Sequence, residues 1–122
     1  MNLRLIAMLG VVALLVASCG GGISASSCAE VSDVTMELFQ RLIDDIDDEF
    51  GDLTVEEFVG VGTDLPSLDR FRDEADQIDA IAADLGCTQS QITAEVEARV
   101  GELTASTEPG AFIIDAIRVG GL

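Results

Sequence analysis

The residues with the clearest capacity for chemistry are acidic side chains that crowd one short stretch of the chain. Six acids fall between residues 44 and 52, and the next one follows at residue 56. Calcium in proteins is bound by carboxylate oxygens, commonly in a loop that contains a glycine for its sharp turn. The composition of this stretch therefore raises the hypothesis of a weak calcium site. Its candidate ligands are Asp45, Asp47, Asp48, Glu49, Asp52 and Glu56.

The spacing of these acids does not fit a calcium loop of the EF-hand type. A loop that starts at Asp45 puts Phe50 at the position that needs glycine. A loop that starts one residue later places Gly51 correctly, but Ile46 and Phe50 then occupy ligand positions. A helix explains all of these residues, because Ile46 and Phe50 continue an apolar stripe, the acids form its solvated face and Gly51 ends it. The helix is the preferred interpretation, and calcium binding is the alternative.

Catalysis has little support among the residue types present. The chain has no histidine and no lysine, so a serine or cysteine nucleophile would lack its usual base. Paired carboxylates can hydrolyse glycosidic bonds, but tryptophan and tyrosine, which normally line a sugar cleft, are also absent. The glycines at residues 60 and 62 lack the basic residue that follows in a phosphate-binding loop. We therefore expect a protein that is not an enzyme and has no cofactor.

The charge of the chain limits its partners. The formal net charge is −17 at pH 7. A surface this acidic repels phosphate backbones and anionic lipid headgroups. We expect no nucleic-acid partner and no flat adsorption on a membrane. High solubility, salt adaptation or a cationic partner would each explain the charge.

The first residues have the organisation of an export signal. Arg4 supplies a positive charge, and an apolar run over residues 5–16 is too short to span a bilayer, which takes about 20 apolar residues. The run ends in the sequence Val16-Ala17-Ser18-Cys19, which resembles the lipobox of bacterial lipoproteins. An ordinary secretory peptide with an incidental cysteine is the alternative.

The lipobox resemblance implies a lipid anchor and divides the chain into three parts. Residues 1–18 are then a lipoprotein signal peptide, and Cys19 is the new N-terminus that carries a diacylglyceryl thioether. Residues 19–27 form the anchor and a flexible tether rich in glycine and serine. Residues 28–122 form a helical domain at the extracytoplasmic face of the bacterial cell membrane.

The two remaining cysteines, Cys28 and Cys87, form an even pair. Outside the cytoplasm such a pair usually becomes a disulfide. A loop of roughly 60 residues closed in this way stabilises the fold by about 4 kcal/mol on the chain-entropy model. Free thiols, with Cys87 buried, are the alternative.

Capping signals and apolar spacing predict an all-α domain of four to five helices. A capping box at residues 27–30 opens a helix whose apolar stripe reaches Phe50, and a second box at residues 54–57 opens a short helix. Pro66 begins a helix with apolar residues at heptad spacing from Leu68 to Leu85. Antiparallel packing of the two long helices brings both cysteines to one end of a small bundle, in agreement with the disulfide.

Two further helices are predicted in the C-terminal part. One starts at residues 88–91 and extends through Leu103. The other is capped by Thr107 and contains Phe112, Ile113, Ile114, Ala116 and Ile117, which we expect to pack in the core. Its apolar run is too short to span a membrane.

The pattern of the whole chain resembles short, secreted, two-cysteine helical proteins of actinobacteria whose function is unknown. The resemblance rests on the lipobox, the tether, Ser-Cys-Ala-Glu-Val at 27–31 and Ala-Asp-Leu-Gly-Cys at 83–87, and it implies no activity. The expected function is a non-enzymatic interaction module that docks another protein of the cell envelope. The alternative is a lipoprotein that binds a small ligand or calcium through the acidic run. An exposed apolar patch favours the first class, and a closed cavity favours the second.

Overall fold

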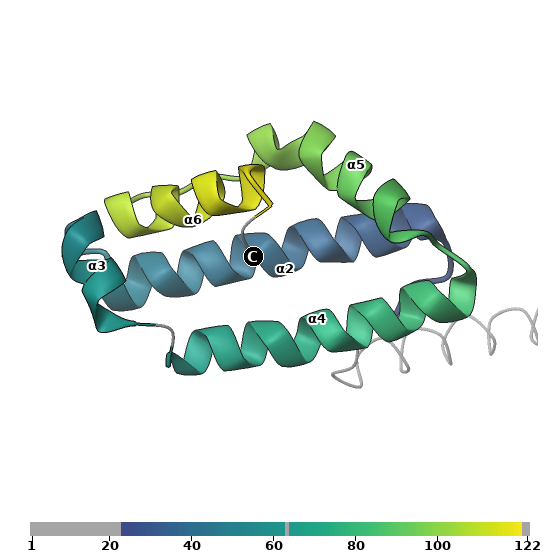
Figure 1. Cartoon of the computed structure of the whole chain (residues 1–122), viewed down its shortest axis with the longest axis horizontal. Helices are drawn as coiled ribbons and strands as arrows, with labels where there is room; N and C mark the ends of the chain where they lie inside the picture. The colour runs from purple at the N-terminus through teal and green to yellow at the C-terminus, as the bar shows by residue number, and fades with distance from the viewer. Residues whose placement is uncertain (1–22, 63, 121–122) are drawn as a thin grey trace, which may run out of the picture.

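The computed structural model describes residues 23–62 and 64–120, which form helices joined by short connections (Figure 1). The elements are α2 (Cys28–Phe50), α3 (Val55–Val61), α4 (Pro66–Leu85), α5 (Gln89–Arg99), the short 3-10 helix η1 (Val100–Glu102) and α6 (Glu108–Arg118). These two ranges contain no strand, and the predicted all-α fold is confirmed. The predicted signal peptide, Cys19 and the first part of the tether lie outside the described residues. No helix within the two ranges is long and apolar enough to cross a membrane.

The two long helices, α2 and α4, run antiparallel, as the sequence predicted. Cys28 and Cys87 form the predicted disulfide, with their Cα atoms 5.7 Å apart. Two ion pairs join the same helices further along, Arg41–Glu74 at 3.0 Å and Asp45–Arg70 at 3.4 Å. As the residue number on α2 rises from 28 to 41 to 45, the number of its partner falls by equal steps from 87 to 74 to 70. All three links therefore belong to one antiparallel register.

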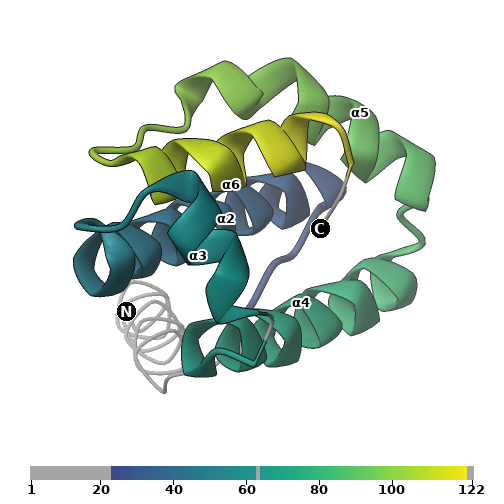
Figure 2. The same ribbon diagram turned by 60° about the vertical axis from the view of Figure 1, so that its left-hand side comes forward.

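α2 is the central helix of the bundle. It contacts α4 on one side and α5 and α6 on the other (Figures 1 and 2). Leu42, Ile43 and Ile46 of α2 expose 2% of their surface or less and form the centre of the core. Met36 and Ile43 are also buried. They lie off the apolar stripe that the sequence predicts for this helix, which consists of Val31, Val34 or Thr35, Leu38, Phe39, Leu42, Ile46 and Phe50. The reason is that a single stripe describes a helix covered on one side, whereas α2 is covered on two.

Local capping chemistry determines most of the helix starts. The side chain of the residue before α2, α3, α5 and α6 accepts a hydrogen bond from a backbone N–H of the first turn, as predicted for Ser27, Thr54, Thr88 and Thr107. The capping box of α3 is complete, because the Glu57 carboxylate also accepts from the backbone N–H of Thr54 at 3.0 Å. Before α2, the Glu30 carboxylate accepts instead from the side chain and backbone of Ser26. These bonds lower the pKa of Glu30 below its ordinary value.

Three details of the predicted helices differ from the structure. The helix that starts after Thr88 ends at Arg99, and η1 carries the chain on to a buried Leu103. Leu85, the last position of the predicted heptad seam, is 38% exposed because it lies at the very end of α4. Phe112 of α6 is likewise 38% exposed, whereas Ile113 and Ile117 are buried as predicted. Among the described residues, no element covers the side of α6 that carries Phe112.

Candidate functional site

The six candidate calcium ligands point to different surroundings. Asp45 faces α4, where it pairs with Arg70. Asp47 faces the start of α6 and accepts hydrogen bonds there. Four of the six are exposed to solvent, namely Asp48, Glu49, Asp52 and Glu56. Among residues 23–62 and 64–120, no three Asp, Glu, His or Cys side chains are grouped closely enough to hold a metal ion. The acidic run is thus divided between two interhelical contacts and the solvated surface of the helix.

Asp47 attaches the start of α6 to α2. One carboxylate oxygen accepts from the backbone N–H of Ser106 at 2.8 Å, and the other accepts from the hydroxyl of Thr107 at 2.5 Å. The same Thr107 hydroxyl oxygen caps α6 by accepting from the backbone N–H of Gly110 at 3.3 Å. Gly110 permits this close approach, because a Cβ atom there would collide with the Asp47 carboxylate and displace it. Sequence reasoning missed this role because Asp47 is one acid among many.

Two other polar residues of α2 make similar contacts at intervals of seven residues. The Gln40 side-chain amide donates to the carbonyl of Thr104 at 2.9 Å and accepts from its N–H at 3.1 Å. Asp33 accepts from Arg99 of α5 at 2.7 Å. Hydrogen bonds to Glu102 and Asp33 raise the pKa of the Arg99 guanidinium. The positions 33, 40 and 47 therefore form a polar stripe that holds α5, Thr104 and the start of α6 against α2. Their heptad spacing is the only signal of this stripe in the sequence.

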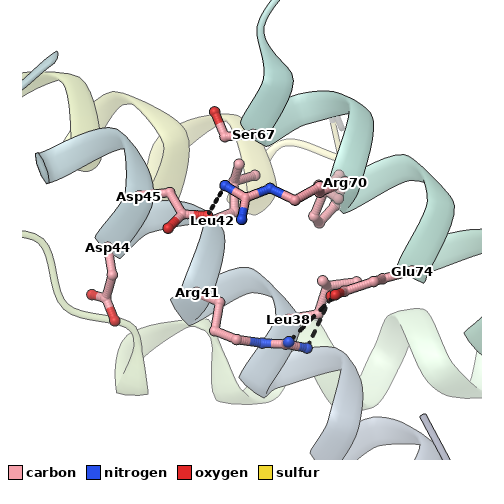
Figure 3. A pocket seen from close by; sticks show the side chains of 9 residues that line it. Leu38, Arg41, Leu42, Asp44, Asp45, Ser67, Arg70 and Glu74 are labelled. Carbon is pink, nitrogen blue, oxygen red and sulfur yellow. Dashed lines mark hydrogen bonds and ion pairs between the residues drawn. The ribbon is translucent and has the colours of Figure 1, made fainter. Parts of the chain in front are cut away.

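A polar cavity of about 330 Å³ lies between α2 and α4. Figure 3 shows the Arg70 guanidinium reaching toward Asp45 and the Arg41 guanidinium reaching toward Glu74 across this gap. Both arginines already pair with carboxylates, and Asp44 adds a third acid to the lining. Among the described residues that line the cavity, each cationic side chain already forms an ion pair, so none is free to bind an anionic ligand. Ion pairs this exposed each stabilise a fold by about 0.5 kcal/mol, so their main effect is on the helix register.

The same cavity contains one hydroxyl without a partner. Ser67 is only 1% exposed, and its Oγ makes no hydrogen bond within the described residues. A serine nucleophile needs a base within hydrogen-bond distance. No described side chain supplies such a base to Ser67.

The helices α3 and α6 meet at one end of the molecule (Figures 1 and 2). Apolar side chains of both helices are exposed. Phe112 of α6 is 38% exposed, although its ring contacts the buried Phe58 with ring centroids 6.2 Å apart. Val59 of α3 is 56% exposed. Val55 lies four residues earlier on the same face of α3 and, with Phe112, lines a surface depression of about 500 Å³.

Acidic residues surround these apolar side chains. Glu56 of α3, together with Glu108 and Asp115 of α6, lines the same depression. We define the α3–α6 patch as six residues, Val55, Glu56, Val59, Glu108, Phe112 and Asp115. Asp115 pairs with Arg118 at 3.1 Å, whereas Glu56 and Glu108 form no ion pair within the described part of the chain. Residues 42–69, which include α3 and its connections, contain no arginine, so this end of the bundle is strongly negative.

No protein-family model, curated protein or solved structure matches the chain.

Proposed function

We propose that this protein is a non-enzymatic interaction module of the bacterial cell envelope, anchored by a lipid on Cys19 at the extracytoplasmic face of the membrane. It docks another envelope protein through the α3–α6 patch. The observation that supports docking is that two apolar side chains, Phe112 of α6 and Val59 of α3, are exposed on helices that contact each other. Aromatic residues are enriched at protein–protein contacts, and an apolar patch rimmed by polar residues is typical of such sites.

The position of the patch suits an anchored protein. The tether joins the domain at Cys28, at the start of α2, and the patch lies near the other end of that helix (Figure 1). With 23 residues, α2 is about 34 Å long at a rise of about 1.5 Å per residue. The acidic surface is repelled by anionic headgroups, which favours a domain that stands away from the bilayer. A lipid at Cys19 would therefore present the patch to proteins beyond the membrane surface.

The anchor is tested by following Cys19 itself. Cys19→Ala removes the only cysteine of the lipobox and should release the protein from the membrane fraction without changing its melting temperature. Mass spectrometry of the mature N-terminus should find a lipid-modified cysteine. Tight membrane association of the Cys19→Ala protein would contradict the anchor.

Docking is tested by site-specific photo-crosslinking on intact cells. A photoreactive amino acid replaces Val59 or Phe112 in the full chain, and the matched control replaces Gln77, an exposed residue of α4. One and the same envelope protein should be captured from positions 59 and 112 and not from position 77. Equal products from all three positions, or none from the patch, would overturn the proposal.

A further inference from the structure

We propose that the occupant of the α3–α6 patch is a basic amphipathic helix of the partner protein. This inference rests on the proposed docking function and specifies its chemistry. It follows from the shape of the patch and from its charge, which also argues against other occupants.

The shape of the patch suits a helix. Val55 and Val59 lie four residues apart on one face of α3, where Val59 is exposed, and Val55 lines the depression together with Phe112 of α6. Two helices with a depression between them form the type of groove that receives the apolar face of a third helix. Such a ligand inserts apolar side chains three and four residues apart, and its remaining positions lie over the rim.

The charge of the rim selects a basic ligand. Glu56 and Glu108 are exposed, on opposite sides of the depression, and have no cationic partner among the described residues. Lysines or arginines on the flanks of a docked helix would form ion pairs with these two carboxylates. Complementary rim charges also speed association and make it sensitive to salt.

The same charge argues against the other candidate occupants. A second copy of this chain has a net charge of −17 and would bring like charges to the rim. An anionic lipid surface is repelled for the same reason. A helix that is apolar on one face and basic on its flanks is the ligand that satisfies both the apolar residues and the acids.

The test uses the full chain with the photoreactive amino acid at position 59 and a labelled synthetic peptide. The peptide contains leucine and lysine at helical amphipathic spacing. One control peptide has the same composition in scrambled order, and another has glutamate in place of lysine. Crosslink yield is measured against peptide concentration, because a site-specific crosslink reports occupancy of the patch and not general attraction to an acidic protein. The same titration with the photoreactive group at Gln77 measures nonspecific contact.

Charge variants identify the rim as the cause. Glu56→Gln with Glu108→Gln removes the two unpaired patch carboxylates, and Asp73→Asn with Asp84→Asn removes two exposed acids of α4. An exposed ion pair contributes about 0.2–1 kcal/mol. Two of them therefore correspond to a loss of about two- to thirtyfold in affinity, at 1.4 kcal/mol for each factor of ten. The α4 variant should change affinity much less.

The outcomes separate this inference from the proposed function. Tighter binding of the amphipathic basic peptide than of both controls, weakened by the patch variant alone, supports the inference. Equal weakening by both variant pairs, or equal binding of the scrambled peptide, overturns it. If crosslinking on cells captures a partner from position 59 but the peptides fail this comparison, docking stands and its chemistry is different. If the cells yield no partner, docking itself fails.

Discussion

Replacing Asp47 with alanine tests whether this acid fastens α6 or belongs to a calcium site. In the structure its carboxylate accepts from the backbone N–H of Ser106 at 2.8 Å and from the hydroxyl of Thr107 at 2.5 Å. Asp47→Ala removes both acceptors at once. It leaves the Ser106 N–H without its partner and frees the Thr107 side chain that caps α6. We therefore expect a clear loss of stability.

The size of the loss follows from the number of bonds and their exposure. A hydrogen bond to a charged group contributes about 1.5–3 kcal/mol when it is well shielded. Asp47 is only half-buried, so we expect about 2 kcal/mol from its two bonds together. For a domain of this size that corresponds to a decrease of roughly 8–16 °C in melting temperature.

Asp48→Ala is the matched control, because Asp48 is the next residue, is exposed and is also a candidate calcium ligand. A surface substitution of this kind changes stability by about 0.5 kcal/mol or less. Thermal unfolding of both variants is followed by circular dichroism with and without millimolar calcium. If the acids formed a calcium site, calcium would raise the melting temperature of the unsubstituted protein, and this increase would be smaller in both variants. Equal melting temperatures for Asp47→Ala and Asp48→Ala would refute the role of Asp47 in fastening α6.

Three other substitutions test separate features. Cys28→Ser should reduce the free energy of unfolding by about 4 kcal/mol in oxidising buffer, because it opens the long loop closed by the disulfide; an unchanged melting curve would contradict this. Gly110→Ala should lower the free energy of unfolding by about 1–3 kcal/mol, seen as a lower urea midpoint, because its Cβ collides with the Asp47 carboxylate. Gly101→Ala, with open space around the residue, should leave the midpoint unchanged. Ser26→Ala should raise the lowered pKa of Glu30 toward its ordinary value in an NMR titration. With Ser26 present, the contribution of Glu30 to stability is complete above its ordinary pKa and is lost as the pH falls through the lowered one; an unmoved pKa in Ser26→Ala would assign the shift to another cause.

Most helix starts, and the end of α4, were predictable because they depend on chemistry within a few residues. A threonine at position 54 and a glutamate at position 57 satisfy each other's backbone N–H groups whatever the rest of the chain does. Gly86 ends α4 with a φ of 75°, a left-handed conformation that glycine adopts without strain. The disulfide was predictable for a related reason, since two helices of similar length have one simple antiparallel arrangement that brings Cys28 to Cys87.

The contents of the core were harder to predict because burial depends on how many neighbours a helix has. The periodicity of α2 identified Leu42 and Ile46, which face the interior in any packing. It did not identify Ile43, which is buried only because a second layer of helices covers α2 from another side. The reverse error occurred at Phe112, whose apolar character predicted core packing. No described element covers its side of α6. The α3–α6 patch therefore could not be predicted from the sequence alone.

The polar stripe of α2 connects the core of the bundle to the α3–α6 patch. Gln40 and Asp47 position the segment that leads into α6, and α6 carries Phe112 and Glu108. A binding surface that is rigid before association loses less conformational entropy on docking. Asp47 is thus expected to act as a positioning residue for the patch, although it lies outside it.

This expectation has a measurable consequence beyond stability. At a temperature where the Asp47→Ala protein is still folded, its crosslink yield from position 59 should fall below that of the unsubstituted chain. Cys28→Ser makes the matched comparison, because it destabilises the opposite end of the bundle by at least as much. If both variants, compared while folded, bind equally, the patch does not depend on the attachment of α6. If only Asp47→Ala weakens docking, the contact between α2 and the start of α6 determines the geometry that the partner recognises.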